Sequence, residues 1–130
     1  MKKKKRIIII LLCIILFILI GISFCLKALV NDVNSITVSN PNIANISDVI
    51  YVGEYYVTPV YAKLEVSVTK HKITGIKIIE HENGLGGKAE KIVDDVIRRQ
   101  SLEVDAVSGA TVSSKCIIKA IENALQSGSK

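Results

Sequence analysis

Residues that build disulfides and metal centres are scarce in this sequence. Its 130 residues include three cysteines and two histidines. Cys13 and Cys25 fall in a stretch without charge, so Cys116 stands alone in the remainder, which excludes an internal disulfide there. His71 and His81 have no cysteine or acidic cluster at the spacing that zinc sites use. Neither a zinc site nor a disulfide-stapled fold is expected.

An excess of positive charge is confined to the N-terminus. The formal net charge is +5, and five of the 17 Lys and Arg residues stand in Lys2–Arg6. The rest of the chain therefore carries 12 basic residues against 12 Asp and Glu. A nucleic-acid-binding domain needs a basic face of its own, so this balance argues against nucleic acid as a partner. The length leaves room for one small domain.

The next segment, Ile7–Leu26, has no charged residue. A helix of this length rises ~1.5 Å per residue and spans about 30 Å, the thickness of a bilayer's hydrocarbon core. The run is long for a signal-peptide core, and Phe24 before Cys25 does not fit a lipoprotein signal. We expect a cytoplasmic basic segment (1–6), an uncleaved transmembrane anchor (7–26) in the lipid bilayer of the cell membrane, and an extracytoplasmic C-terminal part.

The chain after the anchor divides by composition. Residues 27–47 are rich in Asn and Ser and are expected to be a linker, with a short helix near Ala28–Val33. Residues 48–130 show the hydrophobic patterns of a folded domain.

These patterns predict a small α+β domain, an antiparallel sheet with two packed helices, preceded by the transmembrane helix. Alternation predicts strands at Val49–Thr58, with Gly53 as a bulge or bend, and at Tyr61–Thr69 and Ile73–Glu80. The last two strands would form a hairpin. The inward face of the second would carry Ala62, Leu64, Val66 and Val68. Helical periodicity predicts helices at Lys88–Gln100 and Ser113–Gln126, with a short strand at Leu102–Val107 between them.

The least generic segment is Ser108–Ser114, where a glycine turn leads into the last helix. The first N–H groups of a helix lack partners and attract anions such as phosphate. Gly109 lets the backbone approach an anion closely, and Thr111 offers a hydroxyl at that point. Ser and Thr are also the usual helix caps, so the residues alone leave both interpretations open.

A longer string, Asp105-Ala-Val-Ser-Gly-Ala-Thr111-Val-Ser113, resembles the flavinylation motif of the FMN-binding domain family. The family pattern is Asp, two variable residues, Ser or Thr, Gly, Ala, Thr, one variable residue, then Ser or Thr, and each fixed position is matched. The family includes flavin subunits of membrane-bound NADH:quinone and Rnf-type oxidoreductases and small membrane-tethered domains. The resemblance implies FMN joined by a phosphoester to Thr111 through a flavin transferase. The residues implied around it are Asp105, Ser108, Gly109, Ala110 and Ser113.

The resemblance extends over about Asp48–Gln126. The segment His81–Gly86 is similar to the family's glycine loop, which implies Glu82, Leu85 and Gly86 as flavin neighbours. The larger subunits carry Glu-Thr-Pro-Gly where this chain has Glu-Asn-Gly, which points to the small stand-alone branch and leaves the role of Glu82 open. From the residues alone, these glycines form a tight turn with positive φ angles.

The residues alone leave two interpretations open for Asp105 and two for the tyrosines. Asp105 is either a turn carboxylate or a feature that the flavin transferase recognises. The tyrosines either stack on the flavin ring or pack across strands. They are Tyr55, Tyr56 and Tyr61.

The function implied is an electron carrier between membrane or extracytoplasmic redox proteins, and not an enzyme with its own substrate. The domain is too small to enclose a large substrate beside FMN, and no acid–base pair accompanies the motif. One alternative is a sensor, or an accessory module of a membrane redox complex, that binds FMN without a covalent bond. Another is a structural or regulatory membrane protein with a vestigial flavin site.

Overall fold

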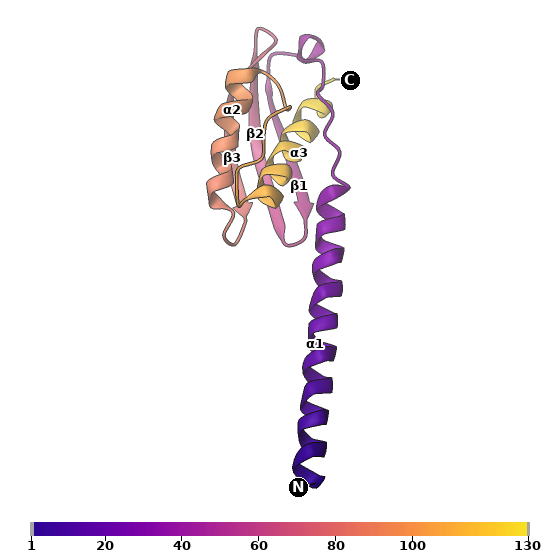
Figure 1. Ribbon diagram of the computed structural model, residues 1–130. Coiled ribbons are helices and arrows are strands. Elements are labelled where there is room, and N and C mark those ends of the chain that lie inside the picture. The colour runs from indigo at the N-terminus through magenta and orange to yellow at the C-terminus, as the bar shows by residue number, and fades with distance from the viewer. Residues whose placement is uncertain (1, 130) are drawn as a thin grey trace. The chain divides into compact units, whose positions relative to one another are not determined.

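One long helix, α1 (Lys2–Asn34), dominates the N-terminal part of the chain (Figure 1). A computed structural model describes residues 2–129, and the chain separates into two units, residues 1–34 and 35–130. By length and composition, Lys3–Asn34 is long and apolar enough to cross a membrane, and none of its most apolar window is buried. The expected anchor, 7–26, lies within α1, and the short helix expected at Ala28–Val33 is part of it.

The second unit is built on a three-stranded antiparallel sheet with the order β1-β2-β3. Its strands are β1 (Ile50–Val57), β2 (Val60–Thr69) and β3 (Lys72–Glu82). The predicted hairpin is confirmed, because β2 and β3 pair antiparallel around a turn at Lys70 and His71. The predicted inward face of β2 is also confirmed. Each of its four residues is at most 2% exposed: Ala62, Leu64, Val66 and Val68.

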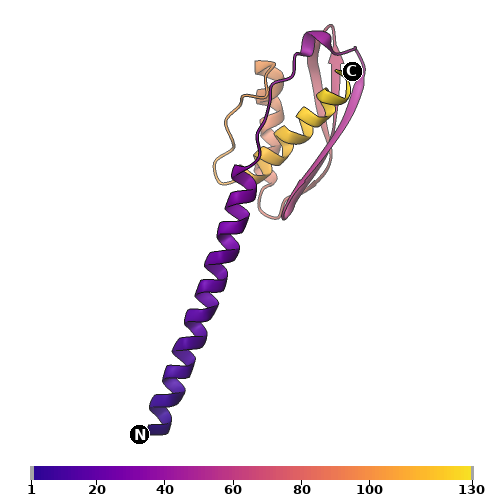
Figure 2. The same cartoon turned by 90° about the vertical axis from the view of Figure 1, so that its right-hand side faces the viewer.

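Two helices of this unit pack on the same face of the sheet (Figure 2). They are α2 (Ile92–Arg99), which follows the short 3₁₀ helix η2 (Gly87–Lys91), and α3 (Thr111–Ser127). The helix α3 lies against β1 and β2, and α2 lies against β3. The core is formed where the helices meet the inner face of the sheet. This arrangement confirms the α+β class.

The connection between the two helices differs from the prediction. All of residues 100–110 are described, and none joins a strand, so the short strand expected at Leu102–Val107 is wrong. The reason is that the N–H of Leu102 donates to the side chain of Asn40 at 3.2 Å, where a strand would pair with backbone. The helix α3 also begins at Thr111, two residues earlier than expected.

Gly53 is not the bulge or bend that its position in a strand suggested. It pairs in regular register with Leu64 in the middle of β1. A Cβ atom at Gly53 would stand 2.1 Å from the carbonyl oxygen of Ala120 and 2.6 Å from the backbone nitrogen of Ala124. Gly53 therefore lets α3 approach the sheet closely, which explains a glycine in a strand interior.

The segment 35–47, which falls in the expected linker (27–47), belongs to the second unit and packs on the rest of it. Ile36 and Ile46 are buried, and the short 3₁₀ helix η1 (Ile43–Asn45) lies between them. The hydroxyl of Ser39 donates to Glu122 Oε1 at 2.6 Å, and Lys119 Nζ donates to the carbonyl oxygen of Thr37 at 2.9 Å. Side-chain bonds to α3 therefore hold this segment in place.

Glu122 is the centre of this attachment, and its carboxylate is only 2% exposed. It accepts hydrogen bonds from Ser39, Gln126 and, at 2.7 Å, Lys119. Burial alone would raise the pKa of Glu122, but the hydrogen bonds from Lys119 and Ser39 outweigh burial and hold the pKa below its usual value of 4.5. The ionised form of Glu122 therefore stabilises the folded state.

The stability that Glu122 provides should depend on pH. Because its pKa is lower in the folded than in the unfolded chain, the contribution is complete above about pH 4.5 and is lost as pH falls through the folded-state pKa. We expect Glu122→Gln to lower the free energy of unfolding by about 1–3 kcal/mol at pH 7 and to cost progressively less as the pH falls below 4.5. Thermal unfolding of the full chain in detergent from pH 3 to 7 would measure both effects. An equal cost at every pH would contradict this account.

Candidate flavin site

A pocket of about 250 Å³ opens at one end of the sheet. Three segments that are distant in the sequence line it: the turn between β1 and β2, the glycine loop after β3, and the start of α3. The lining residues are Pro59, Val60, Asn83, Leu85, Gly86, Gly109, Ala110, Thr111, Val112 and Ser113. The fold thus brings the glycine loop and the Gly-Ala-Thr segment, which the sequence presents as separate motifs, to one place.

The start of α3 leaves its first N–H groups without a side-chain cap. The N-cap is Ala110, which makes no side-chain cap hydrogen bond, and Thr111 is the first helical residue with an exposed side chain. The hydroxyl of Ser114 instead accepts a hydrogen bond from the N–H of Val107 at 2.9 Å. The capping interpretation therefore does not apply to Thr111. The uncapped N-terminus favours an anion through the positive end of the helix dipole.

Two glycines shape the pocket wall. Gly109 has a φ of +73°, a left-handed conformation that favours glycine. Gly86 carries no strain of this kind, but a Cβ there would stand 2.0 Å from Ser113 Oγ and 2.8 Å from Ser113 Cβ. Gly86 therefore allows the glycine loop to lie directly against the first turn of α3. At Gly84 the φ of +54° agrees with the tight turn expected from the sequence.

The other residues named from the resemblance lie outside the pocket lining. Glu82 is exposed at the end of β3, opposite Tyr61 on β2. Asp105 and Ser108 are exposed on the loop before α3. Asp105 therefore stands where a second protein could reach it, and both of its interpretations stay open.

The tyrosines do not line the pocket. Tyr56 and Tyr61 are directly opposite each other on β1 and β2, and the hydroxyl of Tyr61 donates to Glu54 Oε2 at 2.8 Å. This hydrogen bond to a carboxylate raises the pKa of Tyr61 to about 12. Tyr55 is half-buried. Cross-strand packing accounts for Tyr56 and Tyr61, and the placement of these residues does not support stacking on a ligand in this pocket.

A buried histidine that sequence reasoning did not place at the site supports the glycine loop. The side chain of His81 is 2% exposed, and its Nδ1 lies 3.0 Å from Glu90 Oε1. Asn83 Nδ2 lies 3.1 Å from the same nitrogen, so the tautomer of the ring decides whether Nδ1 donates to Glu90 or accepts from Asn83. Among the described residues, His81 Nε2 is a buried nitrogen without a partner. The imidazole joins the end of β3 to η2 and thereby sets the path of the loop between them. Its inward position could have been inferred only from the register, which places His81 opposite Ala62.

These features fit the phosphate end of FMN. An uncapped helix N-terminus, a left-handed glycine and an exposed hydroxyl lie together, and they suit a phosphate group. A pocket of about 250 Å³ is smaller than the roughly 300–1,000 Å³ that enclose a whole ligand of drug size. A pocket of this volume suits part of an FMN molecule and is too small to enclose all of it.

Comparison with known families agrees with this geometry. The model of the FMN-binding domain family matches residues 56–126, more than half of the chain. The matched region contains the β1–β2 turn, the glycine loop and the start of α3, and so all of the pocket lining. A search of curated proteins finds no match. On the strength of the family match, this chain belongs to the FMN-binding domain family.

Proposed function

We propose that this protein is a membrane-anchored electron carrier whose FMN is joined by a phosphoester to Thr111. The observation that carries the proposal is the position of Thr111 in an FMN-binding domain. Its exposed hydroxyl stands at the first residue of an uncapped helix and lines the pocket formed with the glycine loop. Phosphate and hydroxyl would meet there.

The attachment step needs an activated FMN donor, because a free phosphate monoester has no good leaving group. In a flavin dinucleotide, the nucleoside monophosphate is a good leaving group. In this step Thr111 Oγ forms a bond to the phosphorus of the FMN half, and the phosphoanhydride bond to the nucleoside monophosphate breaks. The nucleotide leaves with the electron pair, and the hydroxyl proton passes to a base.

That base has to come from another protein. The lining residues of the pocket include no Asp, Glu, His, Cys or Lys among the described side chains, so no neighbour in the pocket can deprotonate Thr111. A flavin transferase would supply the base and the metal ion that phosphoryl transfer uses. The exposed Asp105, six residues before Thr111, is a candidate contact for that enzyme.

The size of the site supports the electron-carrier role. FMN, when bound, supplies reversible electron transfer, and the protein supplies attachment and orientation. Because the pocket holds only part of the cofactor, the chain leaves no separate room for an organic substrate to be enclosed beside it. Partners would be redox proteins of the membrane or of the extracytoplasmic space that approach the exposed part.

The membrane placement is part of the proposal. The helix α1 has the length and composition of a transmembrane span, and Lys2–Arg6 stand at its start. Basic residues remain on the cytoplasmic side, so the flavin domain would lie outside. A covalent bond suits that location, where released FMN would be lost by dilution.

The test is the survival of the flavin after denaturation. The full chain, co-expressed with a flavin transferase, should show flavin fluorescence in a denaturing gel and a mass gain of one FMN less one water, located on the peptide that contains Thr111. Flavin that is present in the native protein and lost on denaturation would support the non-covalent alternative. A chain that carries no flavin in either state would favour a vestigial site.

A further inference from the structure

We propose that Lys88 binds the phosphate of the flavin and is a positioning residue for its attachment to Thr111. The inference rests on the proposed function, and it concerns a residue that neither the motif nor the lining of the pocket includes. Lys88 belongs to η2, which follows the glycine loop.

The position of the ammonium group carries this inference. A Cβ atom built on Gly109 would stand 2.7 Å from Lys88 Nζ and 3.4 Å from Lys88 Cε. The lysine side chain therefore crosses from η2 to the loop before α3 and ends beside Gly109, which lines the pocket two residues before Thr111. Any side chain larger than glycine at position 109 would compete with the ammonium for this space.

No protein group explains why the ammonium lies there. None of the ion pairs among the described residues includes Lys88, and no hydrogen bond recorded for them involves its side chain. The neighbouring backbone supplies a helix N-terminus, which also attracts an anion. A lysine and a helix N-terminus placed on the same small loop both select a negative charge, and a phosphate group satisfies both.

The ammonium of Lys88 would favour the attachment step by holding the phosphate beside Thr111. The phosphate of the flavin dinucleotide must stand beside Thr111 Oγ before the new bond forms, and a cation within reach of Gly109 favours that position. After attachment the phosphodiester keeps one negative charge, so the same ammonium remains a partner. Lys88 is exposed, so solvent weakens the interaction and the expected effect is moderate.

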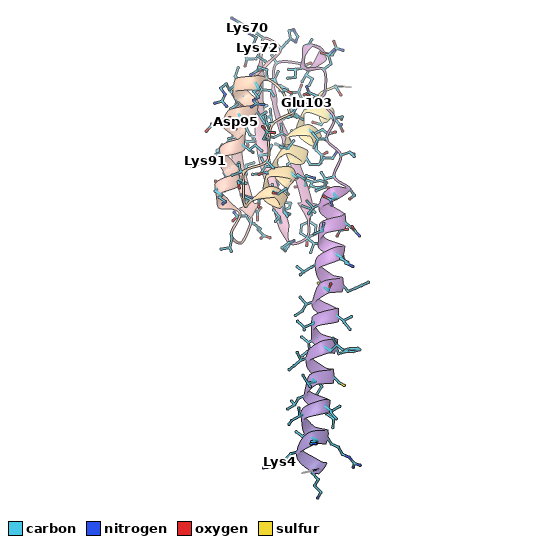
Figure 3. All side chains as sticks on the ribbon, in the orientation of Figure 1. Lys4, Lys70, Lys72, Lys91, Asp95 and Glu103 are labelled. Carbon is cyan, nitrogen blue, oxygen red and sulfur yellow. The ribbon has the colours of Figure 1, made fainter. Side chains whose placement is uncertain are left out.

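The experiment measures the rate at which purified flavin transferase labels the full chain in detergent with a flavin dinucleotide below saturation. We expect Lys88→Gln to slow labelling about three- to tenfold, and Lys88→Arg, which keeps the charge, to remain close to the wild type. The matched control is Lys91→Gln, which removes a charge from the same 3₁₀ helix. Figure 3 shows Lys91 at the edge of α2 that faces away from α3. This control should label at the wild-type rate.

A second readout separates contact with the phosphate from contact with the transferase. In fully labelled protein, the phosphorus NMR resonance of the phosphodiester should shift in Lys88→Gln and stay unchanged in Lys91→Gln. A slower rate with an unmoved resonance would overturn the proposal by assigning Lys88 to recognition by the transferase. If Lys88→Gln is labelled as fast as the wild type, the role of Lys88 is overturned and the proposed function is left intact. A wild-type chain that accepts no flavin would overturn the proposed function itself.

Discussion

Replacement of Thr111 by alanine should abolish covalent flavin completely. Thr111 is the one hydroxyl that is both exposed and part of the described pocket lining, since Ser113 is buried against Gly86. Without its oxygen no phosphoester can form at this point. Fluorescence in a denaturing gel and the intact mass of the chain, after co-expression with a flavin transferase, would measure the loss.

Two variants control this experiment. Thr111→Ser keeps a hydroxyl at the start of α3 and should still acquire flavin. Thr58→Ala removes an exposed hydroxyl next to Pro59 at the pocket and should be labelled like the wild type. Persistent flavin on the alanine variant at position 111 would refute the attachment site, and loss of flavin from the Thr58 variant would show that labelling responds to general disturbance of the pocket.

Replacement of Gly53 by alanine should strongly destabilise the domain. The new methyl group would stand 2.1 Å from a carbonyl oxygen of α3, and a backbone atom cannot rotate away as a side chain can. The helix must move off the sheet, which opens the core between α3 and the inner face of β2. We expect a loss of about 2–4 kcal/mol in the free energy of unfolding, because overpacking a core costs ~1–3 kcal/mol and occasionally more.

Thermal unfolding of the full chain, followed by the circular dichroism of the sheet or by differential scanning calorimetry, would measure this loss. For a domain of this size it corresponds to a decrease in Tm of at least about 10 °C. The matched control is Gly75→Ala on β3, where the nearest atoms to the new methyl group are 3.9 Å away and the methyl group fits. Equal effects of the two substitutions would show that the close approach of α3 to β1 is not what Gly53 provides.

Strand alternation predicts the buried face of β2 but not the role of Gly53 in β1. The alternation in β2 identified its buried face correctly, because a strand covered on one side must place every second residue inward. The same logic applied to Gly53 suggested a bulge, since glycine packs poorly in a strand. Its actual role depends on a helix that is about 70 residues further along the chain, and no local pattern records that contact.

The segment 35–47 gives a second case. Its Asn and Ser residues are typical of linkers and predict one. In the folded chain these same side chains form the attachment, through Ser39 to Glu122 and through Asn40 to Ser101 and Leu102. A polar segment is mobile when its side chains find no partner and is fixed when they form hydrogen bonds to the domain. Whether such partners lie close enough is decided by the tertiary structure.

By itself, the sequence determined the hydrophobic N-terminal helix, the β-hairpin, the amphipathic closing helix and the family motif that contains Thr111. These features depend on spacing along the chain, on helical or strand periodicity and on a contiguous string of residues. Only the tertiary structure decided that the glycine loop meets the start of α3, that Ala110 occupies the cap position, and that Lys88 ends beside Gly109. Those facts depend on contacts between segments distant in sequence, which are formed when the helices pack on the sheet, and on the exact residue at which a helix begins.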